Sequence, residues 1–209
     1  VTQAEWQEVM YNNPSRFKGD NNPVEQVTWY DAVEFCNKKS RKDSLQTVYS
    51  GSGSSIKCDF SKSLMQGCKF TECTFISCDL SLSVLKNCVF NDVTFENSKL
   101  LGISWSSCEE PFNVEFDSCN ISQNSCHLLD LRQIKFVNSL VKDTGFEECN
   151  LEKALFKTCD LEQSVFIKNN LQKANFETSK NYLIDPKQND IKNATFSLPE
   201  ALSFLTLLP

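Results

Sequence analysis

The chain has 209 residues, with 27 Asp and Glu against 21 Lys and Arg, and a formal net charge of −6. This length allows one or two domains, and six Gly and six Pro are too few for a collagen-like or a disordered chain. No apolar run reaches the ~18 residues of a membrane-spanning helix, and an acidic chain is a poor direct ligand for nucleic acid phosphates. The sequence starts at Val1 without a signal peptide, so we expect a piece of a longer, cytoplasmic product.

The first 57 residues contain two segments with apolar residues at helical spacing, 4–10 and 31–39. A loop rich in Pro, Asn and Gly separates them. Their motifs resemble the start of the formylglycine-generating-enzyme (sulfatase-modifying-factor) domain, with Tyr11 in place of its usual Gly. The matching motifs are TQAEW at 2–6, VM at 9–10, NPSRF at 13–17, PVEQVTWYDA at 23–32 and FCN at 35–37.

This resemblance implies a truncated domain that lacks its chemistry. The family's oxidase activity depends on a cysteine pair and on metal sites that lie beyond the portion present here. We therefore expect no enzyme activity, no catalytic residue, no cofactor and no metal site, and a fragment of such an oxidase is a remote alternative. So short a fragment has little core of its own. We expect Trp6, Trp29, Tyr30 and Phe35 to dock on the adjoining repeats, with partial disorder as the alternative.

From Cys58 the chain falls into groups of five residues with an apolar residue at each centre. Ten groups, beginning CDFSK, SLMQG and CKFTE, lead to a break at residues 106–115, and thirteen more follow one residue out of phase. We assign residues 58–181 to this repeat. The bulky centres expected in the core are Phe60, Phe70, Phe75, Leu80, Phe90, Phe95, Leu100, Phe116, Phe136, Phe146, Leu151, Phe156, Leu161, Phe166, Leu171 and Phe176.

A five-residue period fits neither a helix nor a straight strand. Residues five apart are separated by ~140° around an α-helix, and they lie on opposite faces of a strand. A shared core forms only if the chain turns after every five residues and winds into a coil. Successive coils then stack through β-ladders ~4.8 Å apart. The sequence therefore predicts a mainly β solenoid, preceded by a small α-containing segment.

Eight of the eleven cysteines stand two residues before a centre, where Ser, Ala and Thr otherwise occur. A small residue suits a second inward position beside a Phe or Leu, so these cysteines are interpreted as core. Their intervals of five differ from the spacing within zinc knuckles. Pairs twenty apart, such as Cys58 with Cys78, would stack within disulfide range. We nevertheless expect free thiols in a reducing cytosol.

Pentads such as CDLEQ, CNLEK and ANFET resemble the A-(D/N)-L-x-x consensus of pentapeptide-repeat proteins. The resemblance implies a right-handed quadrilateral β-helix with four pentads per coil, nearly six coils in all, and a length of roughly 28 Å. The best understood members of that family resemble duplex DNA and bind DNA gyrase or topoisomerase IV. A type II topoisomerase is therefore the specific partner that the resemblance suggests.

The break carries Trp105, Glu109, Glu110, Pro111 and Phe112. We expect it to project as a loop that contacts a partner, because loops on rigid scaffolds often carry recognition. The alternatives are that Trp105 fills the core beside the phase shift, and that the acidic loop is merely solvated. No base, nucleophile or phosphate-binding loop accompanies these residues.

The last segment, 182–209, is expected to close the solenoid. Ser197 and Glu200 form a capping-box pattern ahead of an apolar helix at about 198–207. An open solenoid end needs a cover, so we interpret this helix as a cap. A homodimer formed through the helix is the alternative.

Together these features predict a non-catalytic scaffold that binds a protein partner of unknown identity through the faces and loop of an acidic rod. Neither nucleic acid nor a membrane is expected as a direct ligand. A modulator or protector of DNA gyrase or topoisomerase IV is the first alternative function. A fusion without a selected role is a further one.

Overall fold

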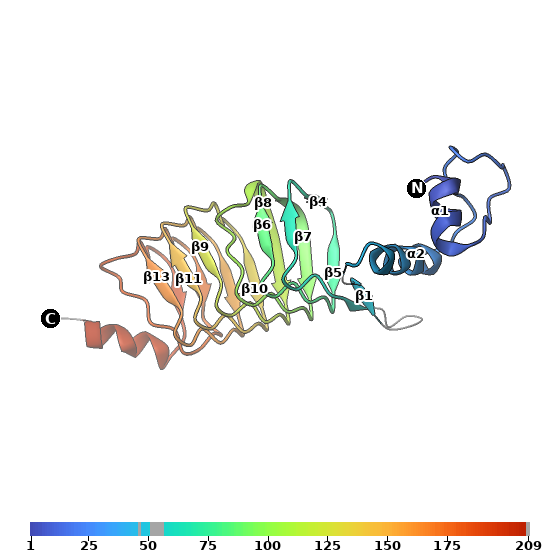
Figure 1. Ribbon diagram of the computed structural model, residues 1–209. Coiled ribbons are helices and arrows are strands. Elements are labelled where there is room, and N and C mark those ends of the chain that lie inside the picture. The colour runs from blue at the N-terminus through green and yellow to red at the C-terminus, as the bar shows by residue number, and fades with distance from the viewer. Residues whose placement is uncertain (46, 51–56, 208–209) are drawn as a thin grey trace. The chain divides into compact units, whose positions relative to one another are not determined.

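The computed structural model describes residues 1–45, 47–50 and 57–207. The chain divides into two compact units, Val1–Asp59 and Phe60–Pro209 (Figure 1). Among the described residues, no helix is long and apolar enough to cross a membrane.

The first unit contains two helices, α1 (Gln3–Met10) and α2 (Trp29–Lys42). Each begins with a capping box, because an N-terminal peptide group has no partner inside its own helix. The Thr2 side chain accepts from the Glu5 N–H at 3.2 Å, and the Glu5 carboxylate accepts from the Thr2 N–H at 2.8 Å. Thr28 and Asp31 repeat this arrangement at the start of α2. Two short strands, β1 (Tyr49–Ser50) and β2 (Lys57–Cys58), pair antiparallel.

The helices of the first unit share a small aromatic core. The rings of Trp6 and Phe35 stack with centroids 5.0 Å apart, and Val9 is buried beside them. Trp6 and Phe35 thus form a core within the first unit, and the expected docking of this unit on the adjoining repeats stays a prediction. Tyr30 is half exposed, and the side chain of Trp29 lies outside the described residues.

The loop between α1 and α2 is organised by the buried side chain of Gln3. Its Nε2 donates to the Phe17 carbonyl at 2.7 Å and to the Pro23 carbonyl at 3.2 Å. Its Oε1 accepts from Asn13 Nδ2 and from the Gly19 N–H. One amide thus satisfies several loop groups that would otherwise be unpaired, as buried polar groups require.

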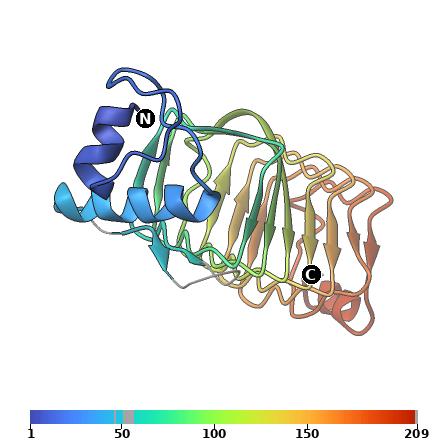
Figure 2. The same cartoon turned by 90° about the vertical axis from the view of Figure 1, so that its right-hand side faces the viewer.

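The second unit is a β-helix of about seven turns, so the expected fold class is confirmed. Its strands are short and parallel, and Figure 2 shows those of successive coils lying side by side. They are β3 (Leu64–Gln66), β4 (Lys69–Thr71), β5 (Thr74–Ile76), β6 (Val84–Lys86), β7 (Val89–Glu96), β8 (Glu109–Asp117), β9 (Ser125–His127), β10 (Lys135–Val137), β11 (Gly145–Glu147), β12 (Leu155–Lys157), β13 (Val165–Ile167), β14 (Asn175–Phe176) and β15 (Thr195–Phe196).

Pairing partners are twenty residues apart in the regular coils, as four pentads per coil require. Phe70 pairs with Phe90, and Phe136 pairs with Phe156. Most corners fall two residues after a centre, where the backbone adopts a left-handed conformation, as at Gln133 (φ 62) and Lys153 (φ 59). That conformation is uncommon for residues other than glycine. Here it recurs because it turns the chain after each short side.

The core is built from columns of inward side chains. One column of phenylalanines has neighbouring rings stacked 4.6 to 5.7 Å apart, close to the spacing between paired strands. Its members are Phe75, Phe95, Phe116, Phe136, Phe156, Phe176 and Phe196. Of the sixteen residues expected in the core, thirteen are buried, and the three in the first coil, Phe60, Phe70 and Phe75, are half-buried.

The β-helix continues beyond residue 181, where the sequence pattern predicted its end. β14 pairs with β15, and Asn170 forms a bridge with Asp190. The pentad pattern is lost here because Asn181 occupies a centre, while Tyr182 fills the core and its hydroxyl lies 2.8 Å from Ser197 Oγ. This extra turn explains why nearly six coils were expected and about seven are formed.

The C-terminal helix η1 (Glu200–Leu207) is a 3₁₀ helix and begins two residues later than expected. Phe204 packs edge-on against Phe196 with ring centroids 4.9 Å apart. The Ser197 hydroxyl lies 3.3 Å from the Glu200 carboxylate, and Leu198 stays exposed. The helix therefore contacts the aromatic column at its last member, in the place where a cap was expected.

Candidate interaction surface

The break in the repeat is a distortion of the β-ladder. Phe90 pairs with Phe112 and Phe95 pairs with Phe116, so the partners are 22 and 21 residues apart. Among the described residues, no left-handed corner occurs between Gly102 and Ser118. The corner after Trp105 is still a turn, closed by the bond from the Cys108 N–H to the Trp105 carbonyl at 2.9 Å. The next corner is lost, and the chain runs through it as the single strand β8. The expectation of a projecting loop was therefore wrong, because the extra residue is absorbed as an irregularity of a strand.

The two aromatic residues assigned to the break belong to the core. Trp105 is only 2% exposed, and its ring lies 5.5 Å from Phe112 and 5.6 Å from Phe90. Phe112 is half-buried and stands edge-on to Phe90. Glu109, Glu110 and Pro111 are exposed, so they alone of the five break residues are fully available to a partner.

The strands at the break form a strongly acidic surface. β7 and β8 carry six Asp and Glu and no Lys or Arg. We call this the acidic β7–β8 surface; its residues are Asp92, Glu96, Glu109, Glu110, Glu115 and Asp117. More widely, residues 58–117 contain nine acidic and four basic residues, while residues 118–209 contain eleven and ten. The negative charge therefore belongs to the first coils and not to the repeat as a whole.

Ion pairs are more frequent on the later coils than on this surface, where Glu115 contacts Lys135 of the next coil at 2.9 Å. Lys142 contacts Glu162 at 2.7 Å and Lys168 contacts Glu148 at 3.0 Å, each across one coil step. The hydrogen bond from Lys168 holds the pKa of Glu148 below its usual value. Among the described residues, no Lys or Arg side chain pairs with Glu96, and none pairs with Glu109 or Glu110. The pKa of Arg132 is raised by its hydrogen bond with Asp130 and also by the charge of Glu110, so Arg132 offsets part of the charge of Glu110. Glu96 and Glu109 keep their attraction for a cation from outside.

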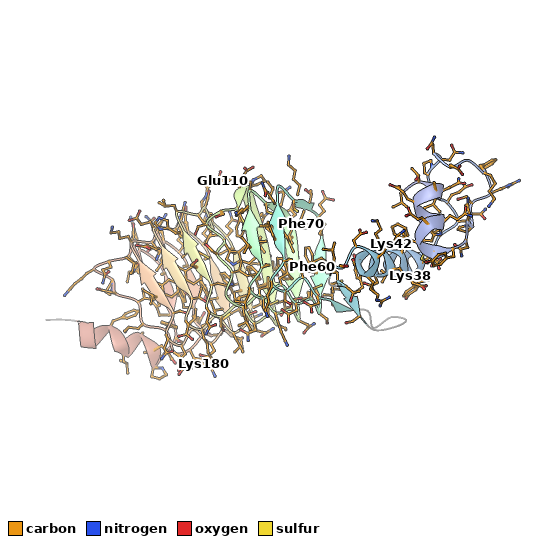
Figure 3. The ribbon with its side chains drawn as sticks, in the orientation of Figure 1. Lys38, Lys42, Phe60, Phe70, Glu110 and Lys180 are labelled. Carbon is orange, nitrogen blue, oxygen red and sulfur yellow. The ribbon has the colours of Figure 1, made fainter. Side chains whose placement is uncertain are left out.

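A cleft lies next to the acidic β7–β8 surface, between β8 and the following coil. Its volume is about 440 Å³. We call it the seam cleft; its lining residues are Glu110, Pro111, Phe112, Asn113, Asp130, Arg132 and Gln133. Arg132 folds onto Asp130 with Nη2 and Oδ2 2.5 Å apart, which lowers the pKa of Asp130. Glu110 marks the edge of the coil in Figure 3.

Several thiols of the β-helix are unsuited to nucleophilic chemistry. All eleven cysteines are free, and six of them are buried. Burial raises the pKa of Cys108 to about 12 and that of Cys119 and Cys159 to about 11. A thiol protonated at neutral pH is a poor nucleophile. Within the described part of the chain, no three His, Cys, Asp or Glu side chains gather to hold a metal ion.

Sequence reasoning located part of this site and missed the rest. Glu109, Glu110 and Pro111 were identified, but Asp92 and Glu96 one coil earlier were not. Counting charges coil by coil would have found them, because β7 and β8 contain no Lys or Arg. The seam cleft has no sequence signal, since it depends on how β8 pairs with its neighbours.

A family model matches part of the chain. The family model for pentapeptide repeats matches in eight copies, at residues 56–92 and 146–180. The chain therefore carries pentapeptide repeats, and it winds them into a β-helix. The family match begins at residue 56, so the resemblance of the first unit to the sulfatase-modifying-factor domain stays a prediction.

Similar proteins come from several sources. A stretch of 49 residues is 57% identical to the chaperone protein LppX of Paenibacillus barcinonensis, and this covers 23% of the chain and 18% of that relative. The chain thus matches less than a fifth of that relative's length.

Three solved structures are similar over most of their own length. The plasmid-mediated fluoroquinolone resistance protein QnrB1 is 18% identical, with 72% of this chain and 83% of that chain covered and a TM-score of 0.44. A pentapeptide-repeat protein of the Arabidopsis thaliana thylakoid lumen is 22% identical, with 71% and 92% covered and a TM-score of 0.23. HetL of Nostoc, involved in the regulation of heterocyst differentiation, is 14% identical, with 65% and 85% covered and a TM-score of 0.21.

Proposed function

We propose that this chain is a non-catalytic scaffold that binds a protein partner through the acidic β7–β8 surface. The observation that carries the proposal is the negative charge of that surface. Six carboxylates lie on two paired strands that contain no Lys or Arg. Within the described residues, Glu115 pairs with Lys135 at 2.9 Å, and the other five carboxylates form no ion pair. Charge that is left unpaired on a rigid frame attracts a complementary partner and orients it.

The chemistry of the surface favours a basic protein over the other classes of ligand. Phosphates are repelled by carboxylates, so nucleic acid is excluded as a direct ligand. The partner that fits carries Lys or Arg residues, and its binding weakens as salt screens the attraction. Because hydrogen-bonded coils hold the carboxylates in place, little ordering of this surface is needed on binding.

A charge-neutralising variant tests this proposal. The triple variant Glu96→Gln, Glu109→Gln and Glu110→Gln removes three of the carboxylates that form no ion pair. The matched control, Glu147→Gln, Glu148→Gln and Glu162→Gln, changes as many carboxylates on the later coils, which lie near His127, Lys168 and Lys142. Proteins captured from a bacterial lysate are quantified by mass spectrometry for the wild type and both variants. The partner is expected to fall about tenfold with the first variant only. Equal capture by all three proteins would contradict the proposal.

A narrower proposal identifies the basic partner as a type II topoisomerase, DNA gyrase or topoisomerase IV. It is supported by the acidic charge on the first coils, which a protein with a basic DNA-binding groove would recognise. Purified protein is added to a gyrase supercoiling assay with and without ciprofloxacin. Inhibition of supercoiling, or rescue from the drug, is the expected result. If neither effect is observed, the topoisomerase proposal is wrong, and the broader proposal of a protein-binding scaffold is unaffected.

The remaining proposals concern the rest of the chain. We place the protein in the cytoplasm, where its thiols stay reduced. The first unit is a remnant of a sulfatase-modifying-factor domain without oxidase activity. Incubation with a cysteine-containing peptide is expected to give no formylglycine by mass spectrometry, and its formation would revive the enzymatic alternative. Self-association through η1 stays an alternative to capping, and analytical ultracentrifugation distinguishes the two.

A further inference from the structure

Neighbouring coils are normally joined by three main-chain hydrogen bonds on the side that contains Leu131 and Leu151. The Leu131 N–H donates to the Asn150 carbonyl at 2.8 Å, and the Asn150 N–H donates to the Leu129 carbonyl at 2.9 Å. At the corner, the Gln133 N–H donates to the Glu152 carbonyl at 2.9 Å. The next coil step repeats all three bonds, from Leu151 to Asn170, from Asn170 to Cys149 and from Lys153 to Gln172.

All three bonds are missing between β8 and the coil that follows it. Pairing between β8 and β10 is confined to the next side, from Glu115 with Lys135 to Asp117 with Val137. Within the described residues, the Asp130 N–H, the Asp130 carbonyl and the Arg132 carbonyl have no main-chain partner in the preceding coil. The irregular pairing of Phe90 with Phe112 draws this part of β8 toward β7. An open edge is thereby left inside the stack.

The open edge faces the seam cleft. Asp130 and Arg132 line the cleft from one side, and residues 110–113 line it from the other. Its volume of about 440 Å³ lies within the range of about 300 to 1,000 Å³ that is typical of ligand sites. Unpaired peptide groups along a strand edge are a template for another strand.

We propose that the seam cleft accepts an extended segment of the partner protein, whose main chain pairs with the open edge at Asp130 and Arg132. The proposal rests on the proposed scaffold function and specifies how a partner would be held. Binding of this kind takes its affinity from main-chain hydrogen bonds and its specificity from side chains on alternate faces.

The lining of the cleft defines the side chains of the segment. Pro111 and the half-buried Phe112 offer an apolar contact. Glu110 offers an exposed carboxylate that forms no ion pair within the described residues, and Arg132 acts on it only through its charge. The guanidinium of Arg132 is already engaged by Asp130. Because neighbouring residues of an extended segment point to opposite faces, the fitting sequence places an apolar residue next to a Lys or Arg.

Amide hydrogen exchange measures the open edge directly. The Asp130 N–H is expected to exchange at least about a hundredfold faster than those of Asn150 and Asn170, which occupy the same position one and two coils later. Protection of Asp130 equal to that of Asn150 would overturn the proposal, because the edge would then be already paired.

Peptide selection on the full chain tests the ligand. Short random peptides displayed on phage are selected on the immobilised wild-type protein, and the enriched sequences are synthesised. Each is also made with alternate backbone nitrogens methylated, which removes hydrogen-bond donors and keeps the side chains. The blocking variant is Gln133→Trp, and its matched control is Lys153→Trp, at an exposed left-handed corner one coil later.

The expected peptides place a basic residue next to an apolar one and bind wild type and Lys153→Trp equally. Methylation and Gln133→Trp are each expected to weaken binding about tenfold or more. Peptides that tolerate methylation, or a selection that yields none dependent on Gln133, would overturn the proposal. The partner captured in the charge-neutralisation experiment is also tested for binding to Gln133→Trp. If it still binds, the proposed scaffold function is retained, and the proposal that its segment inserts into the seam cleft is wrong.

Discussion

The coils before residue 118 and those after it are built from the same five-residue repeat, but they differ in regularity and in charge. The earlier coils contain Trp105 in the core, an irregular ladder at β7 and β8, and carboxylates without basic partners. The later coils keep a spacing of twenty without exception up to β14, and they carry ion pairs between coils. The regular later coils therefore form a stiff frame, whereas the irregular coils before residue 118 provide an open strand edge and carboxylates without ion pairs.

The inner polar residues sharpen this contrast. After the break, Asn169 and Asn189 form a buried ladder, in which the Asn169 N–H donates to Asn189 Oδ1 at 3.0 Å. Their Nδ2 groups donate to the carbonyls of Phe146 and Phe166. Before the break, the hydroxyl of the buried Ser83 has no hydrogen-bond partner. Buried polar groups are thus more completely satisfied in the later coils, which favours a rigid structure there.

The largest expected change in stability comes from removing an aromatic ring from the core of the later coils. Phe156 is fully buried and stacks on Phe136 and Phe176 at 4.9 and 4.6 Å. Phe156→Ala is expected to lower the free energy of unfolding by about 3 to 5 kcal/mol, because it leaves a cavity. Phe112→Ala should cost clearly less, since Phe112 is half-buried beside the seam cleft. Urea denaturation compares the two, and equal losses would remove the distinction between regular and open coils.

A smaller effect is expected from the buried asparagine ladder. Asn169→Ala leaves the Cys149 N–H and the Phe146 carbonyl without their side-chain partner. The expected loss is about 1 to 3 kcal/mol, the cost of unpaired buried polar groups. Lys157→Ala, an exposed change earlier in the chain, serves as the control and should stay within about 0.5 kcal/mol. A loss at Asn169 no greater than at Lys157 would show that the ladder is not stabilising.

The smallest expected effect concerns the thiols. Cys68 and Cys73 in the first coil are half-buried, whereas Cys149 and Cys159 are buried. A thiol reagent at pH 8 should therefore label the first pair before the second, as peptide mass mapping would show. Labelling of all four at one rate would indicate that the two regions open together.

The pH dependence of stability follows from the buried thiols. Burial raises the pKa of Cys159 from its ordinary value near 9 to about 11, so the folded state favours the protonated thiol. This contribution is complete below pH 9 and is lost as the pH rises toward 11. Thermal unfolding between these values should show a decline that Cys159→Ala reduces. An unchanged decline in the variant would assign the pH effect to other groups.

The regular coils could be derived from the sequence because one requirement fixes them. An inward Phe or Leu every five residues forces a turn after each pentad, and this places Phe136, Phe146 and Phe156 in the core. The break could not be derived in the same way. Phe112 fits either a loop or a centre, and only its pairing with Phe90 assigns it to the core.

The acidic surface lies between these two cases. Its charged residues can be read from the sequence, but they form one surface only because β7 and β8 pair side by side. The C-terminal turn was missed for a related reason. Tyr182 replaces the expected centre and is recognised as part of the core only through its contacts with Phe176 and Ser197.

The constant rise of the coil has a consequence for how such a molecule changes in evolution. Each coil in this region contacts only its neighbours, so insertion or removal of twenty residues between Phe136 and Phe176 would alter the span from β8 to η1 in steps of ~4.8 Å. Neither end would need to be redesigned. The number of later coils thus sets the distance between the acidic β7–β8 surface and the C-terminal helix. A tandem duplication of one coil is enough to change this distance.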